Sequence, residues 1–206
     1  MEIAKIMEGK PKNNIYGLMG NINITTNNTN YSIITAYKFN GTVKEYLNSE
    51  KDSSSLKMVM LNEDYLTKKS NELSISELNK VSLAKALIEN KDYLVLNYFE
   101  KELNHQEKEN FKRLWKKLSK DHEKTIIIFT NDITSIWSLA HELIIVDKYN
   151  VINTVSKENY FKIMDNINKP EIVRFTESMR ELGLVVEDYI DVKELLKAIY
   201  RIKESK

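Results

Sequence analysis

Two short apolar runs decide the fold: LVLNYF at residues 94–99 and TIIIFTND at residues 125–132. Apolar runs of this length, rich in β-branched residues, predict buried strands. Between them lies a set of apolar residues at helical spacing, which predicts an amphipathic helix over 106–120: Phe111, Leu114, Trp115 and Leu118. Continuous apolar strands alternating with helices indicate a mostly parallel α/β sheet covered on both faces.

The same patterns predict the other elements. We expect further strands at residues 3–7, 15–19, 32–37, 143–146 and 151–155. We expect helices at 43–47, 55–61, 74–90, 133–140 and 159–166, a helix that starts at Pro170 and ends before Gly183, and a last helix from Asp191. The two C-terminal helices carry the apolar residues Ile172, Phe175, Met179 and Leu182, and Leu195, Leu196 and Ile199, of which the last three are expected to face inward.

Composition narrows the class of protein. The 206 residues are 30% charged and 42% hydrophobic, and the net charge of +1 gives no field that would attract nucleic acid. The absence of cysteine excludes disulfides and Cys-based zinc sites. We expect no signal peptide at the N-terminus, and the longest apolar run, 126–129, is too short to span a bilayer. We divide the chain into a core at 1–155, with a helical subdomain at about 43–90, and a helical extension at 156–206.

The order of these segments resembles the ABC transporter ATPases. Residues 61–87 (LNEDYLTKKSNELSISELNKVSLAKAL) resemble their helical subdomain and signature motif, and residues 93–99 resemble their Walker B strand. Residues 103–104 resemble the D-loop, 126–132 the switch-histidine strand and 143–152 the last core strands. The tail at 160–202 is most similar to the C-terminal extension of energy-coupling-factor ATPases, which power uptake of vitamins and transition metals. The resemblance implies a P-loop NTPase-like fold, here with a reduced helical subdomain.

The position that resembles Walker A lacks most of the groups that bind phosphate. Residues 20–27 read GNINITTN. A phosphate loop needs glycines for close backbone approach, a Lys for charge and a hydroxyl for Mg²⁺. Only Gly20 fits, because Thr26 stands where the Lys is required and Asn27 where the hydroxyl is required. The alternative, an ordinary surface loop at 21–30, explains the same residues.

The hydrolytic positions also differ from the family. Asn97 and Tyr98 stand where Walker B has a metal-binding Asp and a Glu that activates water, and Asn131 replaces the switch His. An amide brings no charge to Mg²⁺, and a phenol with an ordinary pKa near 10 is a poor base at pH 7. The family's Gln between Walker A and the signature is missing, since the only Gln is Gln106.

The signature and D-loop positions are better kept. Ser74 is retained, while Ile75 and Ser76 replace two glycines and Glu77 follows. Ser74 is explained equally well as a helix N-cap, since Ser74-x-x-Glu77 is a capping-box spacing. Asn104 stands where the D-loop has Asp.

These substitutions lead to three hypotheses. The first is a catalytically degenerate ABC-ATPase-like protein with no catalytic residue, metal or cofactor, acting as an accessory or regulatory partner of an ABC or energy-coupling-factor transporter. Its partner would be an ABC ATPase, a membrane subunit or a second copy, and its place the cytoplasm or the inner face of the membrane. The second is a genuine ATP-binding subunit with atypical motifs that uses Mg·ATP. The third is a soluble interaction module that reuses the fold.

Overall fold

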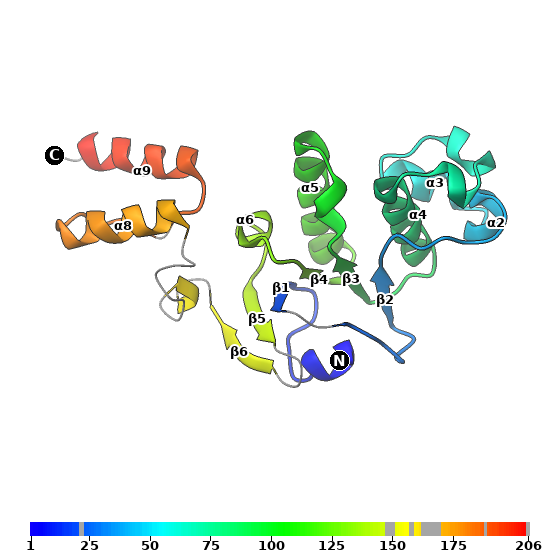
Figure 1. The fold of residues 1–206 in the computed structure, drawn as a ribbon, viewed down its shortest axis with the longest axis horizontal. Coiled ribbons are helices and arrows are strands. Elements are labelled where there is room, and N and C mark those ends of the chain that lie inside the picture. Colours follow the sequence, from blue (N-terminus) through cyan, green and yellow to red (C-terminus); the bar gives the residue numbers. More distant parts are fainter. Residues whose placement is uncertain (21–22, 147–150, 157–158, 162–169, 188, 205–206) are drawn as a thin grey trace.

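The computed structural model describes residues 1–20, 23–146, 151–156, 159–161, 170–187 and 189–204. Its centre is a six-stranded sheet in the order β2-β3-β4-β1-β5-β6, shown in Figure 1. The first five strands run parallel and β6 is antiparallel to β5. The predicted mostly parallel sheet is therefore confirmed. The strands are β1 (Ile15–Gly20), β2 (Tyr31–Ile34), β3 (Tyr93–Asn97), β4 (Thr125–Phe129), β5 (Glu142–Val146) and β6 (Val151–Val155).

Helices cover one face of the sheet. The longest are α4 (Ile75–Ile88) and α5 (His105–Asp121), and the short α6 (Ile133–Ile136) follows β4. Their buried apolar residues form one cluster with the sheet, including Phe111 and Trp115 of α5. Beside α4 lie α2 (Val43–Leu47) and α3 (Asp52–Met58), and the 3₁₀ turn η1 (Glu63–Thr67) contacts both of these. A second 3₁₀ turn, η2 (Ser70–Glu72), precedes α4 in the chain. A further 3₁₀ turn, η3 (Phe99–Glu102), joins β3 to α5.

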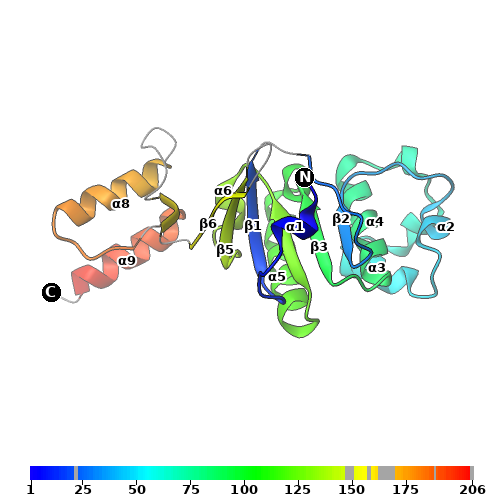
Figure 2. The ribbon, with the colours of Figure 1, turned by 90° about the horizontal axis from the view of Figure 1, so that it is seen from below.

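The opposite face is covered by the N-terminus. The short helix α1 (Ile3–Ile6) packs Ile3 and Ile6 against Tyr16 and Leu18 of β1. Figure 2 shows α1 lying across the sheet beside β1. Residues 3–7 were predicted to form a strand, and that prediction is wrong. Ile3 and Ile6 are spaced three apart, so a single helical turn places both on the sheet, which strand alternation would not do.

The C-terminal helices α8 (Glu171–Glu181) and α9 (Val192–Glu204) form a hairpin with its own small cluster of Met179, Val186 and Leu195. Figure 1 shows this hairpin at the end of the molecule opposite α2 and α3. Leu196 was predicted to face inward, but it is 48% exposed, because Leu195 takes the inward position on α9. Phe175 and Leu182 are exposed as well.

Several helices and strands begin or end at residues other than those predicted. The strand expected at 32–37 ends at Ile34, the helix expected at 55–61 spans Asp52–Met58, and the helix expected at 133–140 ends at Ile136. Pro170 is the N-cap of α8, one residue before the helix, whereas Gly183 follows it with φ +83° as expected of a C′ glycine. Of the helix predicted at 159–166, residues 159–161 are helical and 162–166 lie outside the described residues. The proposed domain limits remain a prediction.

Candidate functional site

The positions that resemble Walker A, Walker B and the switch meet at one edge of the sheet. Strand β4 lies between β3 and β1, and its Phe129 is in register with Asn97 of β3 and Leu18 of β1. The carboxyl ends of the three parallel strands therefore lie side by side. Gly20 is the last residue of β1, and Tyr98 and Asn131 lie just beyond the ends of β3 and β4. Ligands of open α/β sheets bind at this edge, which makes it the place to look for a site.

The segment after β1 does not form a helix in its described part. Over residues 23–30 the chain is extended or turned, and the backbone N–H of Thr25 donates to the carbonyl of Met1 at 2.9 Å. The Thr26 hydroxyl accepts from the N–H of Asn28, which makes a local turn before β2, and Asn27 is exposed. The surface-loop alternative for these residues fits this geometry. A helix N-terminus that could cradle a phosphate is missing from residues 23–30.

Packing against β5 explains why position 20 is a glycine. Its φ is +151°, a region that favours glycine, and a Cβ built there would overlap the carbonyl oxygen of Val146 on β5. The residue that most resembles a phosphate-loop glycine is thus required by the pairing of β1 with β5, without any ligand.

Tyr98 is part of the apolar packing at the sheet edge. Its backbone is left-handed, with φ +51°, and its N–H donates to the carbonyl of Phe129 at 2.9 Å. Its ring contacts the Phe129 ring, with 4.9 Å between centroids. Asn97 is partly buried at the end of β3, and Asn131 is exposed after β4. Within the described parts of the chain, no three His, Cys, Asp or Glu side chains are grouped so that they could hold a metal ion.

A cavity of about 450 Å³ opens at the ends of β3 and β4. It brings together Tyr98 and Asn131, which the sequence singled out, with charged and polar residues that it did not: Glu100, Lys101, Lys108, Thr130 and Asp132. Their place in the sequence could have identified two of them as candidates, since Glu100 and Asp132 both lie within three residues of the end of a buried strand. The cavity therefore contains two carboxylates and two amines.

The surroundings of Glu100 in this cavity shift the pKa of its carboxyl. Burial raises the pKa of its carboxyl, and the charge of Asp132 raises it further, whereas the Thr130 hydroxyl and Lys108 lower it. One of its carboxylate oxygens is buried and has no hydrogen-bond partner among the described residues. A buried carboxylate oxygen without a hydrogen-bond partner is costly, and groups of this kind concentrate at functional sites.

The signature-like and D-loop-like residues serve as helix caps. The Ser74 side chain accepts from the N–H of Glu77 at 3.2 Å, and the Glu77 carboxylate accepts from the N–H of Ser74 at 2.7 Å and from the Tyr65 hydroxyl. Ser76 stays partly exposed in the first turn. Asn104 forms the same reciprocal pair with Glu107 at the start of α5. The capping box predicted at Ser74 is confirmed.

Replacement of Glu77 by Ala should lower stability in a pH-dependent way. Burial raises the pKa of Glu77, but the Tyr65 and Ser74 hydrogen bonds outweigh it and leave the pKa lowered. A lowered pKa in the folded state adds stability above the unfolded value, near 4.3, and this stability is lost as the pH falls. Urea unfolding should show a loss of about 1 kcal/mol at pH 7 that disappears near pH 3. The exposed Glu50→Ala is the control, and a loss that is equal at both pH values would contradict the assignment.

Curated proteins with similar sequences are ATP-binding subunits of transporters. The energy-coupling factor transporter ATP-binding protein EcfA2 of Mycoplasma capricolum is 31% identical over 117 residues, which are 57% of this chain and 40% of that protein. EcfA2 of Staphylococcus aureus strain USA300 is 23% identical over 142 residues, which are 63% of this chain and 50% of that protein. The chain thus spans half or less of the length of these relatives. No protein-family model matches it.

Solved structures share the fold. A dimeric ATP-binding cassette in a post-hydrolysis state with ADP and Pi has a TM-score of 0.58 at 19% identity, over 71% of this chain and 86% of that one. The cbiO1 protein of Clostridium perfringens, part of the cbiONQ transporter complex, has a TM-score of 0.58 at 15% identity, over 81% of this chain and 88% of that one. The chain is therefore distantly similar, over part of its length, to ABC transporter ATPases and has an ABC-ATPase-like α/β fold. No helix in the described residues is both long and apolar enough to cross a membrane.

Proposed function

We propose that this chain is a non-hydrolysing, ABC-ATPase-like accessory or regulatory partner of an ABC or energy-coupling-factor transporter. The observation that carries the proposal is the non-helical connection after β1. Residues 23–30 bond to the N-terminus and turn into β2, so they offer no helix dipole to a phosphate. With Thr26 in place of the Lys and Tyr98 packed on Phe129, the residues present do not fit Mg·ATP as the resembled family binds it.

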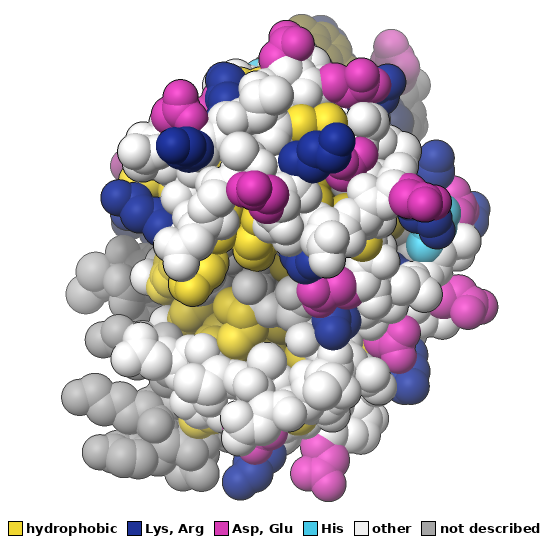
Figure 3. Space-filling model, turned by 90° about the vertical axis from the view of Figure 1, so that its right-hand side faces the viewer, with side chains coloured by type: hydrophobic (Ala, Val, Ile, Leu, Met, Phe, Trp, Pro, Cys, Tyr) yellow, Lys and Arg dark blue, Asp and Glu magenta, His cyan; other side chains and the backbone are white. Residues whose placement is uncertain are grey.

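The kind of partner follows from similarity and from the surface. Two of the solved structures described above are those of a dimeric cassette and of a part of a transporter complex. The face that carries α2, α3 and α4 has Lys and Arg interspersed with Asp and Glu, and hydrophobic side chains gather in a hollow near its centre (Figure 3). Interspersed charge around apolar surface favours a protein partner over nucleic acid. We therefore expect a second ATPase, a membrane subunit or a second copy of this chain.

A Mg·ATP titration separates this function from that of a genuine ATP-binding subunit. Isothermal titration calorimetry with the full chain should show no saturable binding at micromolar ATP, with an active ABC ATPase as the positive control. The cavity with Glu100, Asp132, Lys101 and Lys108 at the strand ends is the observation that favours the rival function. Micromolar affinity for Mg·ATP would reject the non-hydrolysing proposal in favour of that rival.

Restoring the Walker B carboxylates should not create an ATPase. In Asn97→Asp/Tyr98→Glu the metal ligand and base return, but the phosphate loop still lacks its Lys and all but one of its glycines, and residues 23–30 form no helix after it. Phosphate release should stay at the background of the unaltered chain. Replacement of Tyr98 also removes the Phe129 contact, so circular dichroism must first confirm that the variant is folded. Measurable Mg-dependent hydrolysis would show that the phosphate site is better preserved than we propose.

Co-purification tests the link to transport. Affinity purification of the chain from membranes of its own source should recover an integral membrane protein or an ABC ATPase. Recovery of soluble proteins alone would favour the third hypothesis, an interaction module that reuses the fold.

A further inference from the structure

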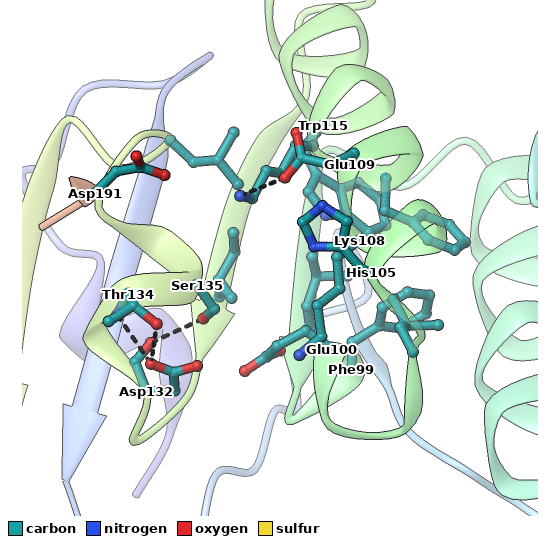
Figure 4. A pocket seen from close by; sticks show the side chains of 16 residues that line it. Phe99, Glu100, His105, Lys108, Glu109, Trp115, Asp132, Thr134, Ser135 and Asp191 are labelled. Atoms are coloured by element: carbon teal, nitrogen blue, oxygen red, sulfur yellow. Dashed lines mark hydrogen bonds and ion pairs between the residues drawn. The ribbon is translucent and has the colours of Figure 1, made fainter. Parts of the chain in front are cut away.

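A second, smaller cavity adjoins the one at the strand ends. It has a volume of about 190 Å³ and lies between η3 and α5 on one side and the start of α6 on the other, with Asp191 from the segment before α9 at its rim. Figure 4 shows the side chains that line it. Glu100, Lys108 and Asp132 line both cavities, so the two are connected at these residues.

The inner wall of this cavity is aromatic. Phe99, Phe111 and Trp115 pack on one another with ring centroids 4.8 to 5.4 Å apart, and all three line the cavity. Leu96, Ile128 and Leu139 complete its apolar lining. An apolar cavity of about 150 Å³ is large enough for benzene, so this one has room for a single ring.

The rim of the cavity carries an excess of carboxylates. Four carboxylates line it, against two lysines: Glu100, Glu109, Asp132 and Asp191, and Lys108 and Lys112. Two of the four are already engaged, since Glu109 pairs with Lys112 at 2.8 Å and Asp191 accepts from the N–H of Lys193 at 2.7 Å.

The other two carboxylates lack a direct ion pair to any described residue, although the charge of Lys108 lowers the pKa of Glu100. Neither Glu100 nor Asp132 forms an ion pair within the part of the chain that the structure describes. Among the described residues, the Asp132 carboxylate accepts hydrogen bonds from Thr134 alone, and one buried carboxylate oxygen of Glu100 accepts none. In Figure 4 the two carboxylates lie on opposite sides of the opening. A buried carboxylate next to a second one is stabilised by a cation placed between them.

We propose that this cavity binds a small organic cation with one ring, its ammonium or amidinium group between Glu100 and Asp132 and its ring against Phe99, Phe111 and Trp115. The carboxylates supply charge-assisted hydrogen bonds, and the aromatic wall supplies apolar contact and ring–ring packing. An anion of the same size would face the unpaired carboxylates and is excluded by them. The proposal does not rest on the proposed function, because none of its residues has a role there, although Glu100 and Asp132 also line the cavity that favours the rival function.

Three probes of one shape test the charge requirement. Benzylamine, benzyl alcohol and benzoate are titrated into the ¹⁵N-labelled full chain at pH 7.5, and chemical shifts are followed by NMR. Benzylamine should bind saturably and shift amides of η3, α5 and α6, at least tenfold more tightly than benzyl alcohol, and benzoate should not bind. Equal affinity for the alcohol, or shifts confined to other elements, would overturn the proposal.

Variants test the residues. Glu100→Gln keeps the shape of the side chain and should weaken benzylamine binding about 10- to 100-fold, the value of a lost charge-assisted hydrogen bond. Glu102→Gln, on the exposed side of the same turn, is the matched control and should leave the affinity unchanged. Ser135→Trp should fill the cavity and abolish binding without removing a carboxylate. If Glu100→Gln folds, as its amide spectrum would show, and binds benzylamine within threefold of the unaltered chain, the site is refuted.

Discussion

Glu107→Gln is expected to lower the free energy of unfolding by about 2–3 kcal/mol, although the new side chain has the same shape and that of Glu107 is 24% exposed. Glu107 of α5 forms an ion pair with Lys80 of α4, whose side chain is only 6% exposed. Removing the Glu107 charge leaves the Lys80 ammonium buried without a counter-charge. The free-energy cost of taking that ammonium out of water is then no longer offset by the ion pair. The capping interaction at Asn104 should survive, because Gln serves at this position of a capping box. The loss therefore reports the ion pair rather than the helix cap.

Urea unfolding followed by circular dichroism at pH 7 measures this effect. The double variant Lys80→Met/Glu107→Gln should recover most of the loss, since no charge then remains buried. Lys57→Met is the control, because Lys57 and Glu63 form an ion pair on the surface, with side chains 66% and 56% exposed. Losing this surface pair should lower the free energy of unfolding by less than about 1 kcal/mol. If Glu107→Gln costs as little as Lys57→Met, the buried pair does not hold α4 to α5.

The sheet could be predicted from the sequence because its strands are buried. Residues 94–96 and 126–129 are at most 4% exposed. Strands that are buried on both faces need apolar residues at every position, and these continuous runs identify the strands in the sequence. Helix α5 shows the opposite case, in which one buried stripe alternates with exposed charges and gives a clear helical period. Both patterns record which surface of an element meets the core.

Elements shaped by a few local contacts were harder to predict. Ile3 and Ile6 could have belonged to a strand or to a helical turn, and only the sheet face beneath them decides for the turn. The capping boxes at Thr42 and Asn104 match the same three-residue spacing as the one at Ser74. They were not recognised because no long apolar run follows either residue directly.

The site was predictable in part for a topological reason. The carboxyl ends of parallel strands lie at one edge of a sheet, so the pairing of β3 with β4 necessarily places Tyr98 near Asn131. The position of Glu100 depends on the left-handed backbone at Tyr98 and the 3₁₀ turn after it, which turn its side chain toward Asp132. No periodic pattern encodes that turn, so the charged cavity and its aromatic neighbour emerge only from the coordinates.

Gly20→Ala is expected to destabilise the protein by about 3 kcal/mol or more, in the absence of any nucleotide. The φ of +151° costs an alanine backbone strain of about 1–3 kcal/mol, and overlap of its Cβ with β5 adds a similar amount. Val146 presents its carbonyl and a methyl group, 2.8 Å from the added carbon, and β1 pairs with β5 at this point. The carbonyl belongs to the strand pairing, so it cannot move aside as a flexible side chain could.

Gly9→Ala is the matched control for Gly20→Ala. Gly9 also has a positive φ, +72°, but a Cβ there would meet no atom within 4 Å, so only the backbone cost of about 1–2 kcal/mol applies. Thermal and urea unfolding of both variants, with and without Mg·ATP, separate the two roles of Gly20. A glycine kept for phosphate binding would give a variant that is as stable as Gly9→Ala without nucleotide and fails to gain stability with it. A glycine kept for strand pairing gives a large loss that Mg·ATP does not change, and this is the result that we expect, because the overlap with Val146 exists whether or not a ligand is present.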